Sequence, residues 1–150
     1  MKKTSVPLVI AFTPDYFIPA ATCLYSIITS MQAEGELHVI CLLSEELPER
    51  LKLKIQLIGE GRTCYSFVNL QGKLQHIYID QKYTEAASYR LLLPDLLPEY
   101  KKVIYIDCDI IVRNDLVQLY HSIDLGMNYL AAVFEASMDF QLDHLKTIGC

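Results

Sequence analysis

The residues best suited to chemistry are two aspartates, Asp107 and Asp109, which flank Cys108. They directly follow the apolar run 102–106, which has the character of a buried strand, and apolar residues resume at Ile110. In an extended chain the side chains at positions i and i+2 point to the same side, so both carboxylates can face one point. Two such carboxylates repel each other, and a divalent cation that prefers hard oxygen ligands relieves this repulsion. The pattern therefore predicts a Mn²⁺ or Mg²⁺ site.

The place of this pair in the chain favours the metal hypothesis. Ligands of open α/β sheets bind beyond the carboxyl ends of strands, and the two aspartates follow such an end. A metal held there can neutralise a diphosphate leaving group. The alternative is a strand that ends in a solvated turn, with Asp109 and Asn114 capping nearby backbone groups.

Three other side chains are candidates for ligand contact. Arg90 stands on an otherwise apolar helix, where it either binds an anionic or hydroxyl-rich ligand or extends over the core as a surface arginine. Tyr16 either stacks on a base or packs in the core, and Thr13 either contacts a ligand or begins a turn.

The elements that must position these residues alternate between strand and helix. Strand patterns occur at 6–12, 37–43, 64–68 and 102–106, with shorter ones at 74–79 and 129–134. Helix patterns occur at 15–31, 48–58, 85–93, 116–122 and 137–148, and the helix from 85 is expected to stop before Pro94. The repeated order predicts one α/β domain over 1–150, with a mainly parallel sheet.

Composition narrows the function classes. Of the 150 residues 52% are hydrophobic and 21% charged, which is enough apolar material for a core, and the net charge of −5 argues against broad nucleic-acid binding. The chain lacks a P-loop, a GxGxxG run and a GxSxG run, which weighs against an NTPase, a dinucleotide enzyme and a serine hydrolase.

The cysteines and the amino-terminal segment bear on location. Five cysteines without CxxC spacing favour reduced thiols in a cytoplasmic protein over a zinc site or a disulfide framework. The basic start and the apolar run 6–12 imitate a secretory signal, but Asp15 interrupts the run early. We therefore expect a cytoplasmic location, with peripheral attachment to the inner face of the membrane as the alternative.

Three segments resemble glycosyltransferase family 8, the group of bacterial lipopolysaccharide galactosyl- and glucosyltransferases and glycogenin. Residues 9–16 (VIAFTPDY) resemble the family's first strand and nucleotide loop, and residues 88–91 (SYRL) resemble its arginine-bearing helix. Residues 102–112 (KVIYIDCDIIV) match its D-x-D strand, and Asp115 and Leu116 continue the match.

The resemblance implies a GT-A fold, a Rossmann-like α/β sandwich, that retains anomeric configuration while it transfers a hexose from a UDP-sugar to a saccharide or glycolipid acceptor. It implies a metal, commonly Mn²⁺, on Asp107 and Asp109, with Asp107 and Cys108 near the donor, and it assigns no catalytic residue. Arg90 is then expected to contact the donor sugar or diphosphate. The implied uridine pocket contains Ala11, Thr13 and Tyr16, and the implied process is lipopolysaccharide assembly.

The sequence departs from the family pattern in two places. Thr13 stands where members often carry an acidic residue. The chain also stops at Cys150, before the family's asparagine-bearing strand, its acceptor region and the histidine that completes its metal site. We therefore expect a GT-A domain incomplete at its C-terminus, a fragment or a truncated product, with exposed apolar edges that favour self-association.

Two rival functions follow from these features. One is a non-catalytic nucleotide-sugar-binding module, since the acceptor region is not in the sequence. The other is a phosphatase of the haloacid dehalogenase class, which also has a D-x-D after a strand. That class places a Gly-Thr or similar pair after the second aspartate, where this chain has Ile110 and Ile111.

Overall fold

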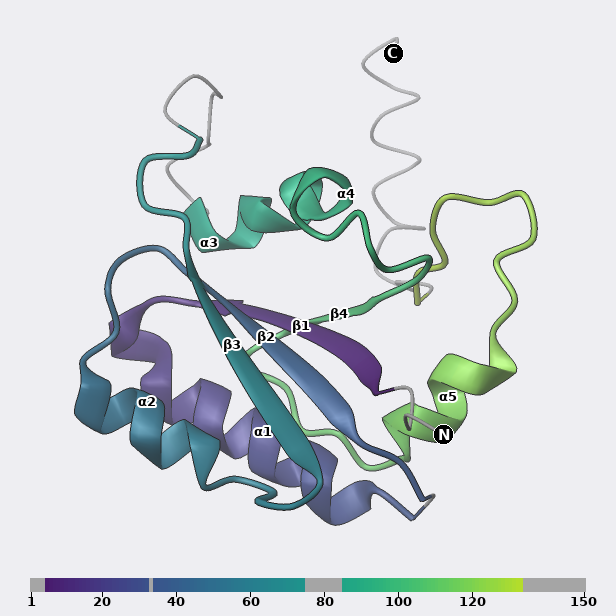
Figure 1. Cartoon of the computed structure of the whole chain (residues 1–150), viewed down its shortest axis with the longest axis horizontal. Coiled ribbons are helices and arrows are strands. Elements are labelled where there is room, and N and C mark those ends of the chain that lie inside the picture. Colours follow the sequence, from purple (N-terminus) through teal and green to yellow (C-terminus); the bar gives the residue numbers. More distant parts are fainter. Residues whose placement is uncertain (1–4, 33, 75–84, 134–150) are drawn as a thin grey trace, which may run out of the picture.

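A computed structural model shows a four-stranded parallel sheet between two layers of helices (Figure 1). It describes residues 5–32, 34–74 and 85–133. The strands are β1 (Val6–Phe12), β2 (Leu37–Leu43), β3 (Thr63–Asn69) and β4 (Ile104–Asp107), in the order β3-β2-β1-β4. The helices are η1 (Pro14–Tyr16), α1 (Phe17–Ser30), α2 (Glu49–Gln56), α3 (Glu85–Ser88), η2 (Tyr89–Leu92), α4 (Leu93–Leu96) and α5 (Leu116–Ser122).

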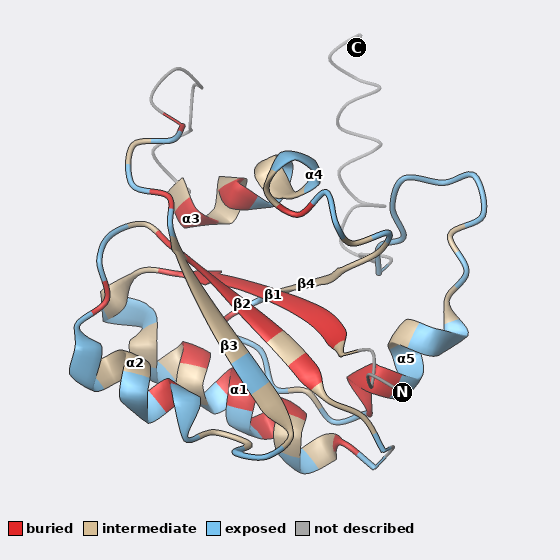
Figure 2. Ribbon diagram, viewed as in Figure 1, coloured by how far each residue is buried: buried red, intermediate tan, exposed pale blue. Residues whose placement is uncertain are grey.

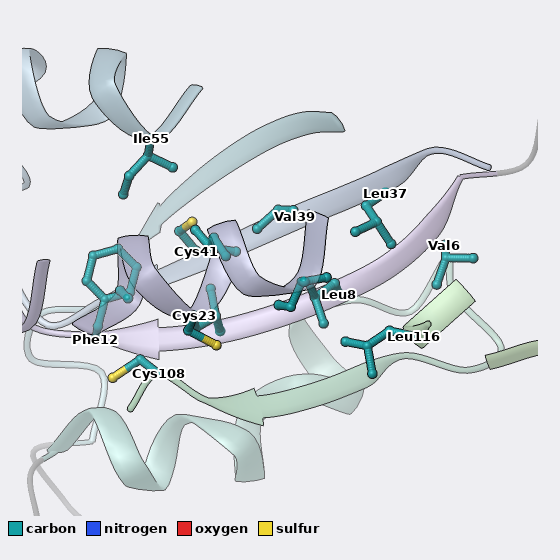
Figure 3. Close-up of a cluster of buried hydrophobic side chains, with 14 of the residues drawn as sticks. Val6, Leu8, Phe12, Cys23, Leu37, Val39, Cys41, Ile55, Cys108 and Leu116 are labelled. Atoms are coloured by element: carbon teal, nitrogen blue, oxygen red, sulfur yellow. The ribbon is translucent and has the colours of Figure 1, made fainter. Parts of the chain in front are cut away.

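Each face of the sheet has its own core. Helices α1, α2 and α5 cover one face, where alternate β1 residues Leu8, Ile10 and Phe12 are buried (Figure 3). The short helices α3, η2 and α4 cover the other face, where Val9 and Ala11 are buried. Figure 2 shows that burial is greatest along β1 and β2, because these strands have neighbours on both edges as well as helices on both faces.

The strand order places a topological switch point beside β1. From β1 the chain moves through β2 to β3 on one side, and then returns to add β4 on the opposite side of β1. All pairings are parallel, and the β1–β4 register pairs Ala11 with Asp107. The carboxyl ends of β1 and β4 therefore lie next to each other, and the chain diverges in opposite directions from that point.

The predicted long strands and helices are confirmed. The expected bounds of β1 and β2 match the observed ones, and β3 and β4 each differ by one or two residues at their ends. The helix expected over 15–31 forms as η1 followed by α1, with Pro19 in the first turn of α1. The helix expected over 48–58 forms as α2, and Gly59 follows it with a φ of +74°.

Two expected elements differ from the structure, and two others lie wholly or mostly outside the described residues. Residues 129–133 form no strand, and Tyr129 and Val133 are 102% and 95% exposed: this run has strand propensity, but no described strand pairs with it. The helical path over 85–93 does not stop before Pro94; it changes from α-helix to 3-10 geometry and back, with Pro94 in the first turn of α4. Leu74 lies in a turn, and the rest of 74–79, like the helix expected at 137–148, lies outside the described residues.

Among residues 5–32, 34–74 and 85–133, no helix is both long and apolar enough to cross a bilayer. The cysteines in these ranges, Cys23, Cys41, Cys64 and Cys108, are free thiols.

Candidate functional site

The site lies at the switch point, where β4 ends. Asp107 is the last residue of β4, and its carboxylate is 57% exposed. Asp109 follows in a turn and is also exposed, whereas Cys108 between them is buried at 9% exposure. This alternation turns both carboxylates toward solvent and the thiol into the core beside Cys23 of α1 (Figure 3). The structure thus brings two hard oxygen donors to the carboxyl edge of the sheet.

Arg90 of η2 converges on the same place from the opposite helix layer. Its Nη2 donates to Asp107 Oδ1 at 3.2 Å, and its Nε donates to the Ala87 carbonyl at 2.8 Å. The guanidinium carbon lies 4.9 Å from the centre of the Tyr105 ring. These three contacts hold the planar cation in one orientation beside the carboxylate. Burial raises the pKa of the Tyr105 phenol, although the Arg90 charge opposes the shift, so this tyrosine stays neutral at physiological pH.

The residues expected to line a uridine pocket follow β1. Ala11 is buried in the sheet as the register partner of Asp107, and Thr13 begins η1, its carbonyl accepting the Tyr16 N–H at 2.9 Å. Tyr16 is 46% exposed, so it is not a core residue. Thr13 and Tyr16 therefore lie beyond the end of β1, the strand next to β4. The contacts of Ala11, Thr13, Tyr16 and Cys108 with a ligand stay predictions. Since Cys108 faces the core, its main chain is the part left for such a contact.

The donor set fits a partial metal site. Asp107 and Asp109 supply carboxylate oxygens, the ligands that Mn²⁺ and Mg²⁺ prefer. Within the described part of the chain, no group of three or more His, Cys, Asp or Glu side chains gathers around one point. Mg²⁺-like ions commonly take one or two carboxylates and complete their shell with water and substrate phosphates, and two aspartates suit that arrangement.

Helix α1 fixes the segment that follows β4, and we call residues 108–115 the D-x-D segment. The Val112 N–H donates to Ser26 Oγ at 2.9 Å, and Ser30 Oγ donates to the Val112 carbonyl at 2.9 Å. At the far end, Asp115 accepts the Gln32 N–H at 2.7 Å and caps α5 by accepting the N–H groups of its first turn. Asp115 thus caps α5, and Asp109 lies in a solvent-exposed turn, which agrees with that part of the alternative interpretation.

The residues of this region differ in how far the sequence alone reveals their roles. An aspartate before an apolar helical run is a typical N-cap, so the role of Asp115 is readable from the sequence. The contact of Tyr105 with Arg90 and the bonds of Ser26 to the D-x-D segment are tertiary. A serine inside an apolar helix gives no indication of its partner.

The parallel sheet, the switch point beside β1 and the two aspartates after β4 agree with the GT-A fold that the family resemblance implies. The chain belongs to glycosyl transferase family 8, whose model matches residues 7–148. This membership argues against the haloacid dehalogenase phosphatase considered above.

Individual relatives agree with this assignment. General stress protein A of Bacillus subtilis is 24% identical over 150 residues, which cover 97% of this chain and 52% of that protein. The galactosyltransferase LgtC, solved in complex with donor and acceptor sugar analogs, superposes with a TM-score of 0.75 at 22% identity, covering 97% of this chain and 52% of that one. The bifunctional glycosyltransferase WbbM gives a TM-score of 0.77 at 24% identity over 92% of this chain and 24% of its own. The chain thus spans about half the length of the first two proteins.

Proposed function

We propose that this chain forms the donor-binding part of a metal-dependent, retaining glycosyltransferase. The enzyme transfers a hexose from a UDP-sugar to a saccharide or glycolipid acceptor. The observation that carries the proposal is the ion pair between Arg90, from the helix layer of η2, and Asp107, the last residue of β4, beside the end of β1. Membership of family 8 and the likeness to LgtC, which was solved with donor and acceptor sugar analogs, support it.

The roles of the residues follow from their chemistry. Asp107 and Asp109 would hold Mn²⁺ or Mg²⁺, which supplies positive charge to a departing UDP. Arg90, already oriented by Tyr105 and the Ala87 carbonyl, presents hydrogen-bond donors to the donor sugar or diphosphate. Prepositioned charge of this kind costs no reorganisation when the bond breaks.

The nucleoside would lie toward β1. Tyr16 presents an exposed ring that can stack on uracil, and Thr13 and Ala11 lie along the same strand end. The proposal assigns no residue of this chain as catalytic. A role in lipopolysaccharide assembly remains part of the proposal.

Calorimetric titration with UDP, with and without Mn²⁺, tests the proposal. We expect Mn²⁺-dependent binding that Asp107→Ala abolishes and that Asp95→Ala, which removes an exposed carboxylate on α4, leaves unchanged. UDP binding without sugar transfer, in a chain extended to the relatives' length, would instead favour the non-catalytic nucleotide-sugar-binding module. If neither the 150-residue chain nor the extended chain binds UDP, the donor-site assignment is wrong.

A further inference from the structure

The hydroxyl of Ser26 occupies an unusual place for a polar group in α1. The residue is only 9% exposed, and Cys23, Leu24 and Ile27 on the same helix are buried around it. Its Oγ donates to the Cys23 carbonyl at 2.7 Å and accepts the Val112 N–H at 2.9 Å. A buried hydroxyl is costly unless it is hydrogen-bonded, and here both its donor and an acceptor position are used.

Val112 is held on both sides of its backbone. The Val112 N–H donates to Ser26 Oγ, and Ser30 Oγ, one helical turn further along α1, donates to the Val112 carbonyl at 2.9 Å. Residues at i and i+4 share one face of a helix, so the two serines form a bracket that faces the D-x-D segment. The Val112 side chain also packs against the core on this face of the sheet. One residue of the segment is thus fixed by two hydrogen bonds and by packing.

This bracket matters because the segment lacks regular structure. After β4 ends at Asp107, residues 108–114 contain a turn and then irregular chain, with neither a helix nor a strand ladder to hold Asp109. The backbone is anchored instead by α1: the Cys23 thiol lies 3.8 Å from the Asp107 carbonyl at one end, and Val112 is bracketed three residues after Asp109. The separation of the two carboxylates therefore depends on α1.

We propose that Ser26 is a positioning residue that holds Asp109 where it can share a cation with Asp107. The inference rests on the proposed function, since the cation site is part of it. Ser26 touches neither the metal nor the substrate in this assignment; it acts through the Val112 amide. Its loss frees the D-x-D segment from α1, so part of the cation's binding free energy is spent on ordering that segment.

Ser26→Ala is the decisive variant. Alanine is the better helix former, so the substitution does not weaken α1 itself, but it removes the acceptor of the Val112 N–H. We expect Mn²⁺ affinity at saturating UDP, measured by calorimetry, to fall on the order of tenfold, the ratio that corresponds to one buried hydrogen bond. Hydrogen exchange at the Val112 amide should quicken in parallel, with or without metal.

Two further variants complete the test. Thr29→Ala removes another hydroxyl from α1, one that bonds only to carbonyls of its own helix at 3.0 and 3.1 Å, and it should leave both readouts unchanged. Ser30→Ala removes the half-buried side of the bracket, where water can replace the lost donor, and should give a smaller loss of affinity in the same direction. Ser30→Ala also carries the test if Ser26→Ala does not fold.

The outcomes separate this inference from the proposed function. If the unaltered chain binds Mn²⁺ with UDP while Ser26→Ala and Ser30→Ala bind equally well, the positioning role is refuted and the donor site stands. If the unaltered chain and its extended form bind neither, the donor site fails, and the positioning role fails with it. Weakened Mn²⁺ binding together with faster exchange at Val112, both absent in Thr29→Ala, supports the inference.

Discussion

Replacing Asp115 with alanine should destabilise the protein, because this side chain connects α5 and the D-x-D segment to the end of α1. This carboxylate is 8% exposed. Its Oδ1 accepts the N–H groups of Val117 and Gln118 at 2.8 and 3.1 Å, and its Oδ2 accepts the Gln32 N–H at 2.7 Å. One side chain therefore caps α5 and fastens it to the end of α1.

The expected cost follows from these bonds. Loss of an N-cap typically costs about 1 kcal/mol. A hydrogen bond to a charged acceptor contributes about 1.5–3 kcal/mol, and the Gln32 bond is of this type. The two contributions share one side chain and are not fully additive, so we expect Asp115→Ala to lower the free energy of unfolding by about 3 kcal/mol.

Urea denaturation measures this directly, as a lower midpoint at an unchanged m-value. Asp124→Ala is the matched control. Asp124 is exposed and its carboxylate accepts the Gly126 N–H at 2.9 Å, so its loss should cost less than about 0.5 kcal/mol. Asp115→Asn keeps an oxygen for the cap and should recover part of the loss. A cost below about 1 kcal/mol for Asp115→Ala would refute the reasoning.

Three further predictions concern other parts of the molecule. Gly59→Ala and Gly61→Ala both force alanine into positive φ (+74° and +84°), which costs about 1–2 kcal/mol. Only the Cβ added at Gly59 would lie 2.9 Å from Ile28 Cδ1, so the urea midpoint of Gly59→Ala should fall further than that of Gly61→Ala. Equal midpoints would contradict this. Burial raises the Cys23 pKa from 9.0 to about 11, so between these pH values the folded state keeps a proton that the unfolded state loses. The free energy of unfolding should therefore decline as pH rises from 9 to 11. Urea titrations across that range should show a shallower decline for Cys23→Ala. Arg90→Lys keeps the charge but loses the planar guanidinium group beside Tyr105, so the affinity for a UDP-sugar, measured by calorimetry, should fall about tenfold. The Tm should change by only a few degrees, because the ion pair with Asp107 is exposed. Unchanged affinity would remove Arg90 from the donor site.

The parts of the fold that depend on local pattern could be read from the sequence. Strands β1 and β2 are buried on both faces, so their residues form nearly continuous apolar runs, and their bounds were predicted without error. The run 129–133 is also apolar but lies exposed, because a strand requires a partner as well and the sequence of the run does not specify one.

The candidate site divides in the same way. Asp107 and Asp109 stand out because charged residues interrupt an apolar run, and parallel strands place such residues at one edge. The ion pair of Arg90 with Asp107 joins helix η2 to strand β4 of the sheet, and the bracket of Ser26 and Ser30 joins α1 to a segment more than 80 positions away. Such pairings depend on how elements pack, which residue type and spacing do not encode.

The position of β4 has a consequence for how the protein folds. Strands β1, β2 and β3 pair with their neighbours in chain order, each over seven residue pairs, whereas β4 joins β1 over four pairs after an excursion through almost the whole preceding chain. Closing so long a loop has a large entropic cost, and so short a ladder offsets it with few hydrogen bonds. We therefore expect β4 to dock late in folding. The two halves of the donor site would then meet only at the last step, and a ligand that bridges them would act chiefly by slowing the detachment of β4.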